Sequence, residues 1–243
     1  GAVTNQHRVP PGVGKQPDLA EVLRKASLFE GLDETHLREL ISRGRSRLFA
    51  GKQTVFLEGD RAQGLYVVIR GRVKVFKLSS EGKEQILHIL GPGEPFGEVP
   101  VFAGQHFPAS AETLEESRLF FFPRASFVRL IRNNPGLALN MLAVLSRRLR
   151  VFASLIEDLS LKEVPGRLAA YLLYLSNKDR GATDLELTIT KGQLASLLGT
   201  IPETLSRILG KMSAQGLIET DGRKITLLDP EGLATLAESG RGL

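Results

Sequence analysis

The side chains best placed to do chemistry lie near the C-terminal end of the chain. From Pro202 onward, apolar residues repeat at helical spacing: Leu205, Ile208, Leu209 and Met212. On the opposite side of the same helix lie an acid, a hydroxyl and a guanidinium: Glu203, Ser206 and Arg207. An arginine can donate two hydrogen bonds to a guanine edge, and a glutamate can accept one from the cytosine amine. The segment therefore predicts base reading in the major groove of double-stranded DNA.

Such a helix needs neighbours that hold it. The segment 189–198 predicts a preceding helix, and Gly199, Thr200 and Ile201 break the two apart. Two amphipathic helices alone are more often plain core scaffold. Here, however, residues 216–228 follow as two alternating strands joined at Asp221-Gly222, which predicts a type I′ hairpin. Helix-turn-helix and hairpin together predict a winged helix, and hence a sequence-specific DNA-binding protein.

Composition sets the outer limits of function. The chain has 243 residues, 42% of them hydrophobic and 24% charged, as expected of a soluble protein with two domains. Neither a membrane-spanning run nor a signal peptide is apparent, so we expect a cytoplasmic protein with no membrane partner. The sequence contains 0 cysteines, which excludes disulfides, thiolate nucleophiles and an iron–sulfur cluster.

The charge pattern permits nucleic-acid binding without showing it. The formal net charge is +5, but the region after Lys162 carries about as many acids as bases. Between residues 124 and 150 lie the arginines Arg124, Arg129, Arg132, Arg147, Arg148 and Arg150. We interpret most of them as a solvated helix face; the alternative is that some flank DNA.

The first half of the chain predicts a β-roll. Residues 1–17 are rich in Pro and Gly and predict a disordered tail, and 18–43 predicts helix interrupted at 27–32. Short strands with glycine turns follow over 54–57, 65–69, 73–78, 85–90 and 118–122. Strands at such regular spacing are typical of a barrel or roll, whose pocket is a candidate receptor for a small ligand.

A long helix is predicted next, over about 135–161. It carries a heptad seam of apolar residues: Leu142, Leu145, Leu149, Phe152, Ile156 and Leu159. We expect this seam to form a homodimer interface, which suits a protein reading two half-sites; the alternative is a stripe buried on its own domain. Pro165-Gly166 predicts a hinge, and 167–176 a helix that opens the DNA-binding domain.

The expected organisation is therefore an α+β fold in four parts. They are a disordered tail (1–17), a β-roll sensor domain resembling cyclic-nucleotide-binding domains (18–134), a dimerisation helix (135–163) and a winged helix-turn-helix domain (164–243).

This order of parts resembles the Crp/Fnr family of bacterial transcription regulators over residues 19–232. Three motifs carry the resemblance: residues 93–98 (Gly-Glu-Pro-Phe-Gly-Glu), 147–149 (Arg-Arg-Leu) and 203–207 (Glu-Thr-Leu-Ser-Arg). The resemblance implies phosphate contacts at Thr190, Lys191 and Thr204, and RNA polymerase as a partner if the protein is an activator. Ser206 resembles the Fnr-type serine, which implies a palindromic operator with TTGA-like half-sites.

In the sensor domain, the resemblance implies an effector pocket at Gly97, Glu98, Ser110 and Phe152. The arginine that holds the cyclic phosphate in cyclic-AMP receptors is replaced by Ala109, and the pair that contacts adenine by Phe152-Ala153. A buried phosphate without its arginine is poorly compensated, so cyclic AMP is not the expected effector. Glu98 is then either a ligand-binding residue or only a turn residue.

The more apolar pocket is similar to that of the Dnr-type branch, whose members are linked to haem and nitric oxide. His88 and His106 are weak candidates for haem ligands, because a lone histidine is more often structural. The cofactor and the effector are thus unknown at this point, with haem as one hypothesis.

Two other function classes compete with a DNA-binding regulator. An enzyme is not expected, because the sequence lacks a Gly-x-Ser-x-Gly elbow, a phosphate loop and a His-Glu-x-x-His motif. A small-molecule-binding module without DNA binding is the other alternative, and the exposed pair Glu203 and Arg207 argues against it.

Overall fold

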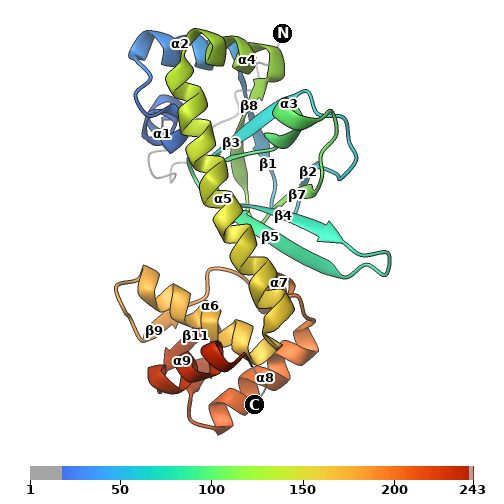
Figure 1. The fold of residues 1–243 in the computed structure, drawn as a ribbon, viewed down its shortest axis with the longest axis vertical. Helices are drawn as coiled ribbons and strands as arrows, with labels where there is room; N and C mark the ends of the chain where they lie inside the picture. The colour runs from blue at the N-terminus through green and yellow to red at the C-terminus, as the bar shows by residue number, and fades with distance from the viewer. Residues whose placement is uncertain (1–17, 241–242) are drawn as a thin grey trace, which may run out of the picture.

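The fold is α+β, as predicted. The computed structural model describes residues 18–240 and Leu243, so the predicted disordered tail at 1–17 lies outside the described residues. One long helix, α5 (Pro135–Leu161), runs through the molecule. A β-roll and its covering helices lie along one half of α5, and the winged helix lies at its C-terminal end (Figure 1).

Short helices open the described chain. They are α1 (Leu19–Lys25), the 3₁₀ turn η1 (Ser27–Phe29) and α2 (Glu34–Arg43). The carboxylate of Asp33 caps α2 by accepting a hydrogen bond from the backbone N–H of His36 at 2.8 Å. The predicted break at 27–32 is confirmed, because η1 separates the two α-helices.

The roll consists of two four-stranded antiparallel sheets, in the orders β1-β8-β3-β6 and β2-β7-β4-β5. The predicted strand segments are all present: β2 (Thr54–Phe56), β3 (Gly64–Arg70), β4 (Val73–Leu78), β5 (Glu84–Leu90) and β8 (Ser117–Pro123). Three strands were not predicted: β1 (Arg45–Phe49), β6 (Pro95–Phe96) and β7 (Ser110–Thr113).

β1 shows why a pattern search misses such strands. Within residues 18–240 it lies at the edge of its sheet with β8 as its one partner strand, and its residues from Arg45 to Leu48 are exposed. Because Phe49 is the one buried residue of β1, the strand has no alternation of apolar and polar residues to detect.

Aromatic rings fill the space between the sheets. The rings of Phe56 and Phe107 stack with their centroids 3.6 Å apart and their planes nearly parallel, and Phe96 and Tyr66 stack beside them. A second apolar cluster lies on the other side, where α1 and the helix α4 (Arg124–Asn133) pack on Phe120 and Phe122. The short helix α3 (Val99–Ala103) follows β6.

The long helix presents two apolar stripes. Met141 and Val144 are buried against the protein's own roll. Three residues of the predicted seam face solvent at a spacing of seven, with exposed fractions of 59%, 68% and 65%: Leu142, Leu149 and Ile156. The other three predicted residues are half-buried: Leu145, Phe152 and Leu159. Leu145 packs against the same apolar cluster as Met141, so the predicted seam overlaps the stripe buried within the domain and only its other side faces solvent.

The winged-helix part is built from α6 (Val164–Lys178), β9 (Asp184–Glu186), α7 (Lys191–Leu197), α8 (Pro202–Ala214), β10 (Ile218–Asp221), β11 (Lys224–Leu227) and α9 (Pro230–Ser239). Its three strands form one sheet in the order β10-β11-β9. A single core of buried leucines and isoleucines joins these elements.

The hinge predicted at Pro165-Gly166 is wrong. Both residues lie in the first turn of α6, where a proline fits because its missing N–H needs no partner. Gly166 is buried, and a Cβ there would lie 3.1 Å from the Cα of Gly240. The helices α5 and α6 separate instead at Lys162 and Glu163.

The predicted wing hairpin is present, but its turn type differs. Asp221 pairs with Lys224, so the two loop residues are Gly222 and Arg223. Gly222 has a φ of +59°, whereas Arg223 is not among the described residues with positive φ. A type I′ turn needs positive φ at both positions, so a glycine at the first position alone is typical of the mirror-image II′ class.

Candidate nucleic-acid interface and sensor pocket

The two helices of the helix-turn-helix begin in different ways. Thr190 caps α7 through a capping box, in which its hydroxyl oxygen accepts from the N–H of Gln193 at 3.1 Å and the Gln193 side chain accepts from the N–H of Thr190 at 2.9 Å. α8 begins after Ile201 without a side-chain cap and with Pro202 in its first turn. Between them, Gly199 has a φ of +68°, which favours glycine.

The burial of α8 separates its two faces. The four predicted apolar residues are buried in the domain core: Leu205, Ile208, Leu209 and Met212. Glu203, Ser206 and Arg207 are exposed. Because these three side chains share one face and are held by a rigid core, they can enter a groove together.

The three residues proposed for phosphate contact lie at the start of α7 and in the first turn of α8. Thr190 and Lys191 are exposed, and Thr204 is half-buried. The Thr190 hydroxyl already accepts the capping hydrogen bond, but its own proton can still be donated to a phosphate oxygen.

The predicted effector site contains a buried ion pair that was not predicted from the sequence. Glu98 is 3% exposed, and its carboxylate accepts a hydrogen bond from Nη1 of Arg148 on α5. Nη2 of Arg148 donates to the backbone oxygen of Pro95 at 2.6 Å. Glu98 is therefore more than a turn residue, and Arg148 does not belong to a solvated helix face. The sequence signals for Arg148 were the Arg-Arg-Leu motif at 147–149 and its position one helical turn before Phe152.

The other predicted pocket residues lie close to the aromatic stack. Gly97 has a φ of +72°, and a Cβ there would lie 3.1 Å from the ring of Phe107. Ser110 is buried, and its hydroxyl oxygen accepts from the backbone N–H of Glu58 at 2.9 Å. Ala109 is buried too and brings no charge to this place. Phe107 was not predicted at this site, because it lies in an irregular loop without a periodic pattern.

The two candidate haem ligands have different surroundings. Nε2 of His88 on β5 lies 3.6 Å from Oε1 of Glu94, whereas the His106 side chain is exposed and its backbone pairs with Arg61. Burial raises the pKa of the Glu94 carboxyl, but the nearby His88 side chain, the hydrogen bond from the N–H of Gly91 and the charge of Arg148 outweigh burial and hold that pKa below its usual value. Among the described residues, three or more histidines, cysteines or carboxylates do not gather anywhere into a metal site.

Comparisons with known proteins agree with this geometry. A family model of the cyclic nucleotide-binding domain matches residues 46–134, and one of the Crp-like helix-turn-helix domain matches residues 166–236. The chain is 32% identical to the CRP-like cAMP-activated global transcriptional regulator of Mycobacterium tuberculosis, over 221 residues that cover 89% of this chain and 99% of the relative.

Two further proteins are similar to this chain. The fumarate and nitrate reduction regulatory protein of Escherichia coli is 32% identical over 195 residues, which cover 79% of this chain and 78% of the relative. The structure of a CooA variant from Carboxydothermus hydrogenoformans superposes with a TM-score of 0.71 at 25% identity, covering 81% of this chain and 89% of that one. The described helices include none that is long and apolar enough to cross a bilayer.

Proposed function

The chain belongs to the Crp/Fnr family of DNA-binding transcription regulators, and from this premise we propose that it is an effector-responsive dimer that binds a palindromic operator. The observation that carries the proposal is the exposed face of α8, where Glu203, Ser206 and Arg207 stand clear of a buried core. The relatives are regulators of transcription and not enzymes, in agreement with the sequence.

In this proposal, α8 enters the major groove and each side chain has one role. Arg207 donates two hydrogen bonds to a guanine, Glu203 accepts from a cytosine amine, and Ser206 contacts a neighbouring base pair. Thr190, Lys191 and Thr204 contact phosphates and set the register. A TTGA-like half-site offers the guanine and, on the opposite strand, the cytosine that these side chains require.

In this proposal, the second copy of the chain binds through α5. Regulators of this family bind DNA and act as dimers, and here Leu142, Leu149 and Ile156 form an exposed apolar row that a partner helix would cover. A two-fold dimer presents two recognition helices to half-sites about 34 Å apart, so the operator must be palindromic. RNA polymerase is the further partner if the protein is an activator.

The effector is proposed to be a small molecule other than cyclic AMP. Its site lies between Gly97, Glu98, Ser110 and Phe152. The M. tuberculosis relative is activated by cAMP according to its name. In this chain, however, buried Ala109 supplies no cation for a cyclic phosphate, and the carboxylate of Glu98 already pairs with Arg148.

Haem with nitric-oxide sensing is supported poorly by the geometry. His88 is engaged with Glu94, and His106 lies at the surface. We therefore derive no sensing step through haem. Titration of the protein with haem tests the hypothesis: a one-to-one complex with a shifted Soret band would support it, and the absence of such a band would end it.

An electrophoretic shift assay tests the proposed function itself. The probe is a duplex with two TTGA half-sites in a palindrome, and the controls are a scrambled duplex, a salt series and excess non-specific competitor. Selective binding of the palindrome is expected. Equal affinity for the scrambled duplex would leave only non-specific charge attraction.

A further inference from the structure

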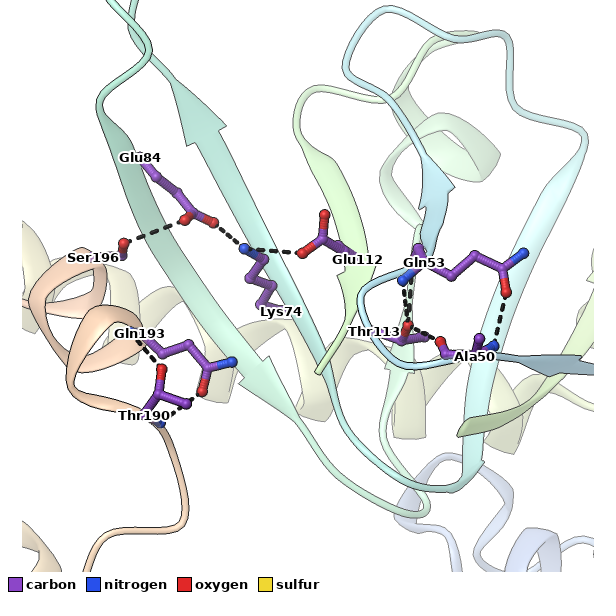
Figure 2. Close-up of polar contacts among 9 residues, drawn as sticks. All are labelled: Ala50, Gln53, Lys74, Glu84, Glu112, Thr113, Thr190, Gln193 and Ser196. Atoms are coloured by element: carbon purple, nitrogen blue, oxygen red, sulfur yellow. Dashed lines mark hydrogen bonds and ion pairs between the residues drawn. The ribbon is translucent and has the colours of Figure 1, made fainter. Parts of the chain in front are cut away.

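The winged helix touches the sensor part at a second place besides the long helix. α7, the first helix of the helix-turn-helix, packs against β5 of the roll. Figure 2 shows Ser196 on α7 pointing toward Glu84 on β5, with Lys74 and Glu112 on the neighbouring strands beyond.

Two polar side chains of β5 make this contact. The hydroxyl of Ser196 donates to Oε2 of Glu84 at 3.3 Å, and Nε2 of Gln85 donates to the backbone oxygen of Leu197 at 3.1 Å. Oε1 of Gln85 lies only 2.7 Å from where a Cβ would stand on Gly199. The turn between the two DNA-binding helices thus rests on the Gln85 side chain.

Glu84 is itself held rigidly. The ammonium group of Lys74 pairs with Glu84 and, at 3.2 Å, with Glu112. The Lys74 side chain is 11% exposed, and its nitrogen lies 4.6 Å from the ring centroid of Phe76. Because one buried cation is shared between two carboxylates and an aromatic ring, Glu84 has little freedom to turn away from Ser196.

Apolar and backbone contacts complete the interface. Ile89 on β5 and Leu114 pack against the core of the winged helix. From the other side, Nε of Arg167 donates to the backbone oxygen of Leu198 at 2.8 Å and Nη1 to that of Lys162 at 2.7 Å. The turn after α7 is therefore held by the roll, by α6 and by the end of α5 together.

We propose that Glu84 and Gln85 are positioning residues that fix the orientation of α8 relative to the dimer helix, and so set the spacing between the two recognition helices. This inference rests on the proposed dimeric, operator-binding function. The two residues form a sensor latch, together with Ser196 and the backbone of Leu197. A change in the sheet that carries β4 and β5 would then reach the DNA-binding surface directly through the latch.

The physical reason is preorganisation. A palindrome must be bound by the two winged helices of a dimer at once. If either winged helix can rotate about Lys162 and Glu163, the second one meets its half-site at a lower effective concentration. A single half-site needs only one winged helix, which the latch does not touch on its reading face. Loss of the latch should therefore act on the palindrome alone.

The test compares palindrome and half-site affinities in the full-length chain. The variant Gln85→Ala/Ser196→Ala removes both side-chain donors of the latch. The matched control Gln105→Ala/Ser80→Ala removes the same two side-chain types from exposed positions of the roll. We expect the latch variant to bind the palindrome about tenfold more weakly or worse, with unchanged affinity for a half-site duplex, and the control to match the wild type.

Each other result overturns the inference. An equal loss on both duplexes would mean local damage to the helix-turn-helix, and unchanged or tighter palindrome binding would mean that the latch does not position α8. If the wild type bound no duplex selectively, the proposed function would fail, which is a different result from any of these.

A second measurement does not depend on DNA. The chain contains 0 cysteines, so Glu84→Cys/Ser196→Cys creates the only thiols. A short bifunctional maleimide should cross-link them within one chain, and adding Gln85→Ala should slow the reaction severalfold. Failure to cross-link, or no slowing, would show that the contact does not hold the domain in solution.

Discussion

Arg148 on the long helix and Glu98 in the roll form an ion pair that is almost wholly withdrawn from solvent. The carboxylate side of the pair is 4% exposed and the guanidinium side 13%. An isolated buried charge is costly in free energy. The fold is therefore stable only while α5 keeps Arg148 against the roll, next to Glu98. The same helix carries the exposed apolar row, so sensor and dimer seam share one rigid element.

Removal of Arg148 should therefore destabilise the fold strongly. Arg148→Ala leaves the Glu98 carboxylate buried without a cation, which typically costs about 3–5 kcal/mol. Urea unfolding followed by circular dichroism measures this loss in the free energy of unfolding. Arg147→Ala is the matched control, because Arg147 is exposed and makes only a 3.3 Å hydrogen bond to Ser27. Equal losses in the two variants would contradict the account, and Glu98→Gln/Arg148→Met should regain part of the stability.

Arg207 and Lys191 should differ in what they contribute to DNA binding. Arg207→Ala should cost about 1–3 kcal/mol on the preferred operator and relax selectivity at one guanine. Lys191→Ala should weaken all duplexes about equally and lower the salt slope by about one. Binding to a set of single-base operator variants at several salt concentrations separates the two. The base-reading role of Arg207 is wrong if its loss affects every sequence alike.

The exposed row on α5 should govern association. Leu149→Glu places a carboxylate in the centre of the proposed seam, where a partner helix would have to bury it. Sedimentation velocity should show a monomer with unchanged circular dichroism. Arg150→Glu, on the adjacent exposed position, should remain a dimer. A dimeric Leu149→Glu protein would place the interface elsewhere.

Glu94 should make stability depend on pH in the acidic range. Its folded-state pKa lies below the usual 4.5, so its carboxylate stabilises the fold above that value, and this contribution is lost as the pH falls through the lowered pKa. Glu94→Gln should thus be less stable than the wild type near neutral pH, with a gap that narrows below about pH 4.5. Thermal unfolding across pH 3–7 measures the gap. Glu81→Gln, an exposed change on the β4–β5 turn, should show no such trend.

Periodic features of this chain could be predicted from sequence, and contacts between distant segments could not. The two faces of α8 and the seam of α5 follow from helical spacing, which any local window contains. The pair Glu98 and Arg148 is separated by 50 residues, and Glu84 and Ser196 by 112. Neither spacing has a local signature, because both contacts exist only after the sheets and helices have packed.

The misplaced hinge has a similar origin. Proline followed by glycine usually marks a break, but at Pro165 the missing N–H costs nothing in a first helical turn, and Gly166 is needed for the close approach of Gly240. Only the position of α9 distinguishes a hinge at Pro165-Gly166 from a first helical turn there. α9 begins 65 residues after Pro165 in the chain.

Among the residues that the structure describes, one border of β1 has no partner strand, and this bears on how the protein behaves in a crowded cell. A bare strand border can recruit strands from other molecules and start aggregates. Here Arg45 and Arg47 project from one side of that border, and the guanidinium of Arg47 lies 5.6 Å from the ring centroid of Phe121. Two like charges repel an identical strand brought alongside, so we expect this arginine pair to oppose growth of the sheet by addition of further copies.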